Sequence, residues 1–102
     1  MRSKIASGMK PISIRTFLKT VGGKSTRAQF HFYGDLKSNK NFSIADISVD
    51  RIERDCDRLT FLFNGNWMLV HIRSENVLRF YNGDMLYYCI DAEGVEVIVN
   101  IL

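Results

Sequence analysis

The spacing of apolar residues predicts a short helix near the start of the chain. After Ser13, apolar residues recur at i, i+3, i+4 and i+7, which places them on one helical face: Ile14, Phe17, Leu18 and Val21. Ser13 suits the N-cap because its side-chain oxygen can accept a hydrogen bond from a backbone N–H of the first turn. Gly22-Gly23 then ends the pattern, since glycine readily takes the left-handed conformation of a C-cap. We therefore expect a helix over residues 13–21.

The period then changes to two, which is typical of a β-strand. Ala28, Phe30 and Phe32 fall on one side of this strand, and Gln29, His31 and Tyr33 fall on the other. A turn is expected at Gly34-Asp35.

Residues 42–56 fit either kind of element. Ala45, Ile47 and Val49 alternate as in a strand, whereas Ala45, Val49, Ile52 and Cys56 would line one face of a helix. Ser48, Val49 and Ile52 prefer strand, so we favour strand here.

Turn signals recur every 8 to 10 residues in the rest of the chain, at Asn64-Gly65, 74–76, Asn82-Gly83 and Glu93-Gly94. Asn-Gly between apolar runs is a strong hairpin signal, because both central residues of the favoured turn need positive φ. The pattern predicts a β-meander with these strands: 58–63, 66–73, 77–81, 85–90 and 95–100.

Short hairpin loops also predict which side chains share a face of the meander, because successive residues of a strand point to opposite faces. With a three-residue loop at 74–76, one face is wholly apolar and is expected to form the core: Leu59, Phe61, Phe63, Met68, Val70, Ile72, Leu78, Phe80, Met85, Tyr87 and Cys89. The second face mixes aromatic, basic and aliphatic residues: Arg58, Thr60, Leu62, Trp67, Leu69, His71, Arg73, Val77, Arg79, Tyr81, Leu86, Tyr88 and Ile90.

These elements predict one α+β, mainly β domain over residues 1–102. We expect a basic flexible arm (1–10), a helix (13–21) and a twisted antiparallel sheet of six to seven strands (27–102). The amphipathic helix packs on the sheet, and a small closed barrel is the alternative architecture. Ten or more large apolar side chains are sufficient for a core at this length, without disulfides or metal.

Charge changes this picture because it is divided unevenly along the chain. The formal net charge is +3, yet all six lysines lie within residues 1–40, where nine basic residues face the single acid Asp35. Residues 41–102 hold five arginines and ten acidic residues. Such asymmetry points to a charged partner, although attraction between the two parts within the fold would explain it equally well.

Candidate catalytic and metal motifs fail on inspection. The stretch 21–25 resembles a phosphate-binding loop only in Gly-Lys-Ser, since Leu18 stands where glycine is required. The carboxylates of residues 46–57 alternate with arginines as on a solvated edge. Four residues could in principle bind zinc, but they lack the short ligand spacing of structural zinc sites: His31, Cys56, His71 and Cys89. We expect no cofactor, no metal and no enzymatic activity.

The second face therefore suggests the main functional hypothesis. We expect a non-catalytic adaptor or inhibitor of the kind that phages and other mobile elements encode. Aromatic and guanidinium groups together can bind a larger protein or nucleoprotein, through Arg58, Trp67, His71, Arg73, Arg79 and Tyr81. A basic segment would add contacts: Lys4, Lys10, Arg15, Lys19, Lys24 and Arg27.

Several alternatives stay open. The aliphatic residues of the second face would also fit burial under the helix, or pairing with a second copy of the chain. Direct binding of nucleic acid is the alternative function, with lysines on phosphates and aromatic rings stacked on bases. No apolar stretch is long enough for a membrane helix, no secretory signal is recognised and the cysteines form no disulfide framework, so we expect a cytoplasmic protein.

Overall fold

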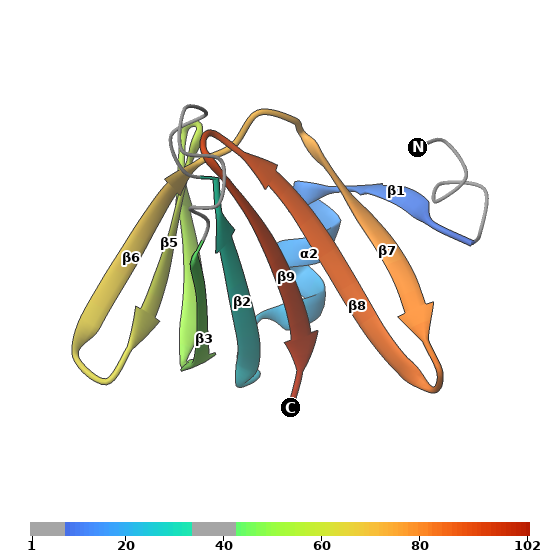
Figure 1. Ribbon diagram of the computed structural model, residues 1–102, viewed down its shortest axis with the longest axis horizontal. Coiled ribbons are helices and arrows are strands. Elements are labelled where there is room, and N and C mark those ends of the chain that lie inside the picture. The colour runs from blue at the N-terminus through green and yellow to red at the C-terminus, as the bar shows by residue number, and fades with distance from the viewer. Residues whose placement is uncertain (1–7, 34–42) are drawn as a thin grey trace.

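Two antiparallel sheets and one short helix make up the structure, which is a computed structural model and describes residues 8–33 and 43–102. The larger sheet has the strand order β1-β7-β8-β9-β2-β3. Its strands are β1 (Lys10–Ser13), β2 (Thr26–Phe32), β3 (Ser43–Val49), β7 (Asn76–Asn82), β8 (Met85–Ala92) and β9 (Val95–Ile101). The smaller sheet contains β4 (Arg51–Asp55), β5 (Arg58–Phe63) and β6 (Asn66–His71), in that order. Figure 1 shows β8 and β9 of the larger sheet passing in front of the helix, α2 (Ile14–Val21).

The helix forms where the apolar spacing predicts it. The side chain of Ser13 accepts the backbone N–H of Thr16 at 3.1 Å, as an N-cap does. Ile14, Phe17 and Val21 are buried, and the Phe17 ring meets Tyr88 of β8 edge-on, with the ring centroids 5.1 Å apart. The predicted packing of the helix on the sheet is confirmed.

A glycine turn ends the helix, also as predicted. Gly23 has a φ of +74°, and the N–H of Lys24 donates to the carbonyl of Val21 at 3.0 Å. The left-handed conformation belongs to Gly23 and not to Gly22, whose φ is −58°.

The core lies between the helix and the two sheets. Phe30 of β2 and Phe61 of β5 are both fully buried and meet edge-on at 5.0 Å, which joins the larger sheet to the smaller one. The alternate valines of β9 face the same core, namely Val95, Val97 and Val99. The predicted core positions of β5 and β6 are confirmed for Leu59, Phe61, Val70 and Ile72.

Residues 43–55 form strands, as favoured from the sequence, but one strand follows another across a bend. β3 pairs with β2, whereas β4 pairs with β5, and Asp50 between them donates its N–H to Leu62 at 2.8 Å. At the opposite corner an isolated bridge joins Ile72 to Ala92. The described strands form two open sheets and not a closed barrel. In the described part of the chain, no helix has the length and apolarity that a bilayer crossing requires.

The predicted register is wrong beyond residue 73. Residues 72–76 do not form a hairpin, because β6 and β7 belong to different sheets. Instead Arg73 donates to the carbonyl of Asp91, and Glu93 donates to that of His71. The crossing exchanges the two faces, so that Val77, Tyr88 and Ile90 enter the core. The predicted core residues Leu78, Phe80, Met85, Tyr87 and Cys89 point to the other side of the larger sheet.

The start of the chain differs too, because Lys10 begins strand β1 where a flexible arm was expected. β1 pairs with β7 at the edge of the sheet, and Pro11 is tolerated there because an edge strand needs only one row of hydrogen bonds. Four residues around a proline are too short a pattern to predict a strand. Residues 1–7 of the expected arm and the turn expected at Gly34-Asp35 lie outside the described residues.

Candidate binding surfaces on the two sides of the larger sheet

Strand register divides the charges of the larger sheet between its two sides. We call the side on which α2 packs the helix side, and the opposite side the open side. Asp46, Asp91 and Glu96 all point to the open side. Among the described residues, no aspartate or glutamate takes a helix-side position in the six strands, and α2 contains none. The helix side of this sheet is therefore free of carboxylates.

The cations of the helix side come from the sheet, the helix and the turn after it. Lys10 of β1 stands opposite Arg79 of β7, on the same side as buried Val77. Arg15 and Lys19 lie one turn apart on the exposed face of α2, and Lys24 follows in the glycine turn. We call these five residues the basic cluster. Four are exposed, and Arg79 is half-buried.

Ion pairing separates the basic cluster from the other arginines. In the described residues, four arginines each bind a carboxylate: Arg27 to Asp46, Arg51 to Glu53, Arg54 to Glu75 and Arg58 to Asp55. No member of the basic cluster has such a partner within the described part of the chain, and neither has Arg73 in the connection after β6.

The carboxylate nearest the start of the helix is neutralised. Glu75 accepts the Ile14 N–H through its backbone carbonyl, while its carboxylate takes two hydrogen bonds from Arg54 Nη2 at 2.8 and 2.9 Å. Attraction between the basic N-terminal part and the acidic remainder was one explanation of the charge asymmetry. Among the ion pairs of the described residues, only Arg27–Asp46 joins these two parts.

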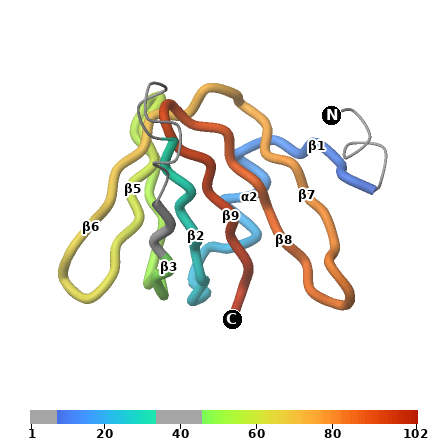
Figure 2. Tube along the Cα trace, viewed as in Figure 1, coloured from blue at the N-terminus to red at the C-terminus, as the bar shows by residue number. Residues whose placement is uncertain are grey.

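The predicted partner-binding residues do not form one face. Arg58, Trp67 and His71 share the outer face of the smaller sheet, where Trp67 is 65% exposed beside an open depression of about 320 Å³. Arg79 and Tyr81 lie on β7 and point to the helix side, where Tyr81 is 62% exposed. Figure 2 shows the β5–β6 and β7–β8 hairpins at opposite sides of the molecule.

The second face is therefore exposed in one part of the chain and buried in another. In β5 and β6 the face is solvent-accessible at Arg58, Trp67 and His71. In β7 and β8 it is the core beneath the helix, at Val77, Tyr88 and Ile90. The reason is the crossing at residues 72–76, which moves the chain from one sheet to the other.

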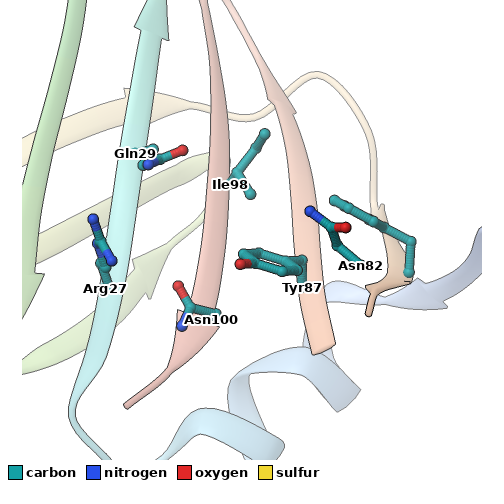
Figure 3. A pocket seen from close by; sticks show the side chains of 7 residues that line it. Arg27, Gln29, Asn82, Tyr87, Ile98 and Asn100 are labelled. Carbon is teal, nitrogen blue, oxygen red and sulfur yellow. The ribbon is translucent and has the colours of Figure 1, made fainter. Parts of the chain in front are cut away.

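The open side carries a hollow that the sequence interpretation missed. A row of side chains crosses four neighbouring strands, in the order Phe80, Tyr87, Asn100 and Arg27. The hollow has a volume of about 210 Å³, and its lining adds Gln29, Asn82 and Ile98 to that row. Figure 3 shows Tyr87, Asn100 and Arg27 on adjacent strands around it.

A signal for the correct register is present in the sequence. Val95, Val97 and Val99 alternate with Glu96, Ile98 and Asn100, so the valines are the better core candidates. A two-residue loop at Glu93-Gly94 pairs Val97 with Ile90, which places the even residues of β8 in the core and Tyr87 outside it.

The open side carries a bidentate ion pair between Arg27 and Asp46. Arg27 donates from Nε and Nη2 to the two carboxylate oxygens of Asp46, at 2.8 and 2.6 Å. These hydrogen bonds lower the pKa of Asp46 below its usual value and raise that of Arg27. Because Arg27 is paired with Asp46, it adds no unpaired positive charge to the hollow.

The described residues do not assemble the candidate zinc ligands. In the ranges 8–33 and 43–102, no three side chains of His, Cys, Asp or Glu lie together as a cation site requires. Cys56 is exposed in the β4–β5 turn, while the thiol of Cys89 donates to Glu96 at 3.3 Å. His71 Nδ1 lies 3.9 Å from Asp57. Nε2 of His31 is buried and has no hydrogen-bond partner among the described residues.

Comparison with known proteins finds no matching family model, no matching curated protein and no matching solved structure.

Proposed function

We propose that the chain is a non-catalytic interaction protein that docks through its helix side on an acidic surface of a larger protein. The observation that supports this proposal is the basic cluster, whose five cations have no carboxylate partner among the described residues. On the helix side, the described residues of the larger sheet and of α2 also place no carboxylate. Exposed cations of one sign raise the association rate with a partner of opposite charge.

Tyr81 supplies the aromatic contact of this proposed surface. It is 62% exposed on the helix side of β7, two residues from Arg79. Tyrosine and arginine are enriched among the residues that dominate binding energy at protein interfaces, because they combine a large apolar area with hydrogen bonding. We expect the basic cluster to set the association rate and Tyr81 to contribute affinity.

Trp67 belongs to a separate surface, and we propose it as a second contact together with Arg58 and His71. The three residues share the outer face of the smaller sheet, whereas Tyr81 lies on the helix side of β7 in the larger sheet. Two contact surfaces on different sheets favour an adaptor over a simple inhibitor. The cytoplasm remains the proposed compartment.

The test is quantitative capture from an extract of the cells that encode the chain. Immobilised wild type is compared with Lys19→Glu, and with Ser48→Asp/Asn82→Asp, which has the same net charge but changes the open side. We expect Lys19→Glu to lose one acidic protein that the wild type and the control both retain. Equal capture by all three would exclude the helix side as the docking surface.

Direct binding of nucleic acid is the second candidate, because a carboxylate-free basic side also suits phosphate. Release of counterions would make that affinity fall steeply as salt rises. Fluorescence anisotropy with a short single-stranded DNA and a short duplex distinguishes the two functions. Binding that is strong at low salt, steeply salt-dependent and lost in Lys19→Glu would favour nucleic acid, whereas its absence at low salt would reject it.

A further inference from the structure

We propose that the hollow on the open side is a binding site for the base of an uncharged nucleoside, with adenine as the best-fitting base. This site lies on the opposite side of the larger sheet from the basic cluster, and the proposal does not depend on the proposed docking function. Its parts are an aromatic wall, an amide floor and a guanidinium wall, each supplied by a neighbouring strand.

The floor is formed by Asn100, which is buried but has an unused amide. Asn100 is only 7% exposed, and its amide has no hydrogen-bond partner among the described residues. The amide is not fully enclosed, in contrast to Oγ1 of Thr26 and Nε2 of His31, and Asn100 lines the hollow. A buried amide costs free energy unless it is hydrogen-bonded, so this side chain is suited to a ligand.

The aromatic wall has one ring face available. Phe80 and Tyr87 are stacked, with their centroids 5.5 Å apart and their planes 17° from parallel. Phe80 therefore covers one face of Tyr87. Asn100 is the neighbour of Tyr87 on the other side, since it lies one position beyond the Tyr88–Val99 pair. Figure 3 shows the Tyr87 ring reaching from β8 toward Asn100 at the hollow, so the ring face that Phe80 does not cover is the one left for a ligand.

The opposite wall is the guanidinium group of Arg27, held in place by Asp46. Arg27 is the direct cross-strand partner of Asn100, and its two hydrogen bonds to Asp46 fix the guanidinium plane. Protein sites commonly stack nucleobases on aromatic rings or on guanidinium planes, and read their edges with hydrogen bonds. A planar ring standing on the sheet between Tyr87 and Arg27 meets these requirements.

The charge of the hollow and its hydrogen-bonding groups narrow the choice of ligand. Asp46 neutralises Arg27, so the hollow offers no free cation for a phosphate group. An asparagine amide presents a donor beside an acceptor, which matches the adjacent N7 acceptor and N6 donor of adenine; guanine presents two acceptors there. Gln29 contributes a further amide, since the only hydrogen bond that its side chain makes among the described residues is a long one of 3.4 Å to Asp46. We therefore expect adenosine to bind better than guanosine or AMP.

The experiment is titration of isotope-labelled protein with adenosine, followed by NMR chemical shifts. We expect saturable one-to-one binding, with the largest shifts at the amides of residues 27, 29, 87 and 100. Tyr87→Leu should weaken binding by about fivefold to a hundredfold, as expected for loss of base stacking. Asn100→Leu, which fills the floor with an apolar side chain of similar size, should weaken it about tenfold or more. Tyr33→Leu, at an exposed tyrosine outside the lining of the hollow, is the matched control and should bind as the wild type does.

The outcomes that overturn the proposal are distinct. No saturable shift at millimolar adenosine would exclude the site, provided that the amide spectrum shows a folded protein. Equal binding by Asn100→Leu, or equal binding of a methyl glycoside, would exclude recognition of a base. A single-stranded oligoadenylate that binds far more tightly than adenosine, and loses affinity in salt, would exclude an uncharged nucleoside as the ligand.

Discussion

Thr26 carries a buried hydroxyl group that has no partner among the described residues. The residue is 1% exposed in β2, and its Oγ1 makes no hydrogen bond within the ranges 8–33 and 43–102. Its neighbours across the strands are Ile101 and Val49, which are apolar. An unsatisfied buried hydroxyl costs roughly 1–3 kcal/mol. Thr26 is therefore a site where the native sequence is not optimal for stability.

Thr26→Val should raise the free energy of unfolding by about 1 kcal/mol, because valine has the same shape without the hydroxyl group. Urea unfolding followed by Trp67 fluorescence measures this change. Thr60→Val is the control, since Thr60 is only half-buried on β5 and should change stability by less than about 0.5 kcal/mol. A less stable Thr26→Val protein would show that the hydroxyl is hydrogen-bonded after all.

Asp46 links stability to pH through its ion pair with Arg27. Its hydrogen bonds with Arg27 lower its folded-state pKa, so it contributes stability that is present above the ordinary aspartate pKa and lost as pH falls through the lowered one. Asp46→Asn should therefore be less stable than the wild type at neutral pH and equally stable in strong acid. The effect is expected to be small because both side chains are solvent-exposed.

Urea unfolding at several pH values tests this dependence. Asp84→Asn, in the β7–β8 turn, removes a carboxylate without an ion pair among the described residues and serves as the control. If the difference between Asp46→Asn and the wild type did not change with pH, the ion pair would not exist in solution.

At the scale of elements, the β4–β5 turn contains the least favourable backbone conformation. Cys56 has a φ of +57°, in the left-handed region that costs a non-glycine residue about 1–2 kcal/mol. The carbonyl of Cys56 accepts a hydrogen bond from Arg54 Nε at 2.8 Å, which holds the turn in place. Cys56 is exposed at this turn, whereas cysteine is usually buried.

Cys56→Gly should stabilise the protein by about 0.5–1 kcal/mol, because the relief of strain exceeds the entropy that glycine loses on folding. Cys56→Val should destabilise it, since a β-branched residue suits the left-handed region least. Thermal unfolding under reducing conditions compares the two variants. The opposite order of stability would mean that the turn adopts another conformation.

The helix acts as a cover for the larger sheet, and Phe17 is its main contact. Phe17 is fully buried and packs edge-on against Tyr88. Phe17→Ala should lower the free energy of unfolding by about 3–5 kcal/mol, as large-to-small changes of buried aromatic residues do. Lys19→Ala on the exposed face of the same helix should have little effect. Denaturant unfolding measures both, and a loss below about 1 kcal/mol for Phe17→Ala would contradict the packing.

The elements could be predicted from the sequence wherever the relevant contacts are local. The helix over 14–21 follows from apolar spacing and its N-cap, and β5 occupies the predicted residues 58–63. Asn64 and Gly65 have φ values of +49° and +76°, which confirms the predicted hairpin. Each of these features depends on a few neighbouring residues.

Prediction fails where the chain changes sheets. Alternation within a strand carries no information across residues 72–76, because the geometry there is fixed by hydrogen bonds to Asp91 and Glu93, far away in sequence. A one-residue error in register then turned every side chain of β7 and β8 to the wrong face. The open-side hollow could not be found from that register, because it placed Phe80 and Tyr87 in the core.

At the scale of the molecule, the larger sheet separates two chemistries. Its helix side carries the basic cluster, while its open side carries Asp46, Asp91, Glu96 and a hollow whose one charged lining residue, Arg27, is paired with Asp46. The formal net charge of +3 conceals this division. If the proposed partner is acidic, this polarity would orient the domain before contact and raise the rate of productive encounters.

The proposed docking function depends on the basic cluster of the helix side binding an acidic partner. The most direct measurement is fluorescence anisotropy of labelled polyglutamate at low salt, with wild type, Lys19→Glu and Ser48→Asp/Asn82→Asp. The two variants have equal net charge, so only the location of the change differs. We expect Lys19→Glu to bind about threefold to tenfold more weakly than the wild type and clearly more weakly than the control. Equal affinities for the two variants would contradict the claim, because net charge alone would then explain binding.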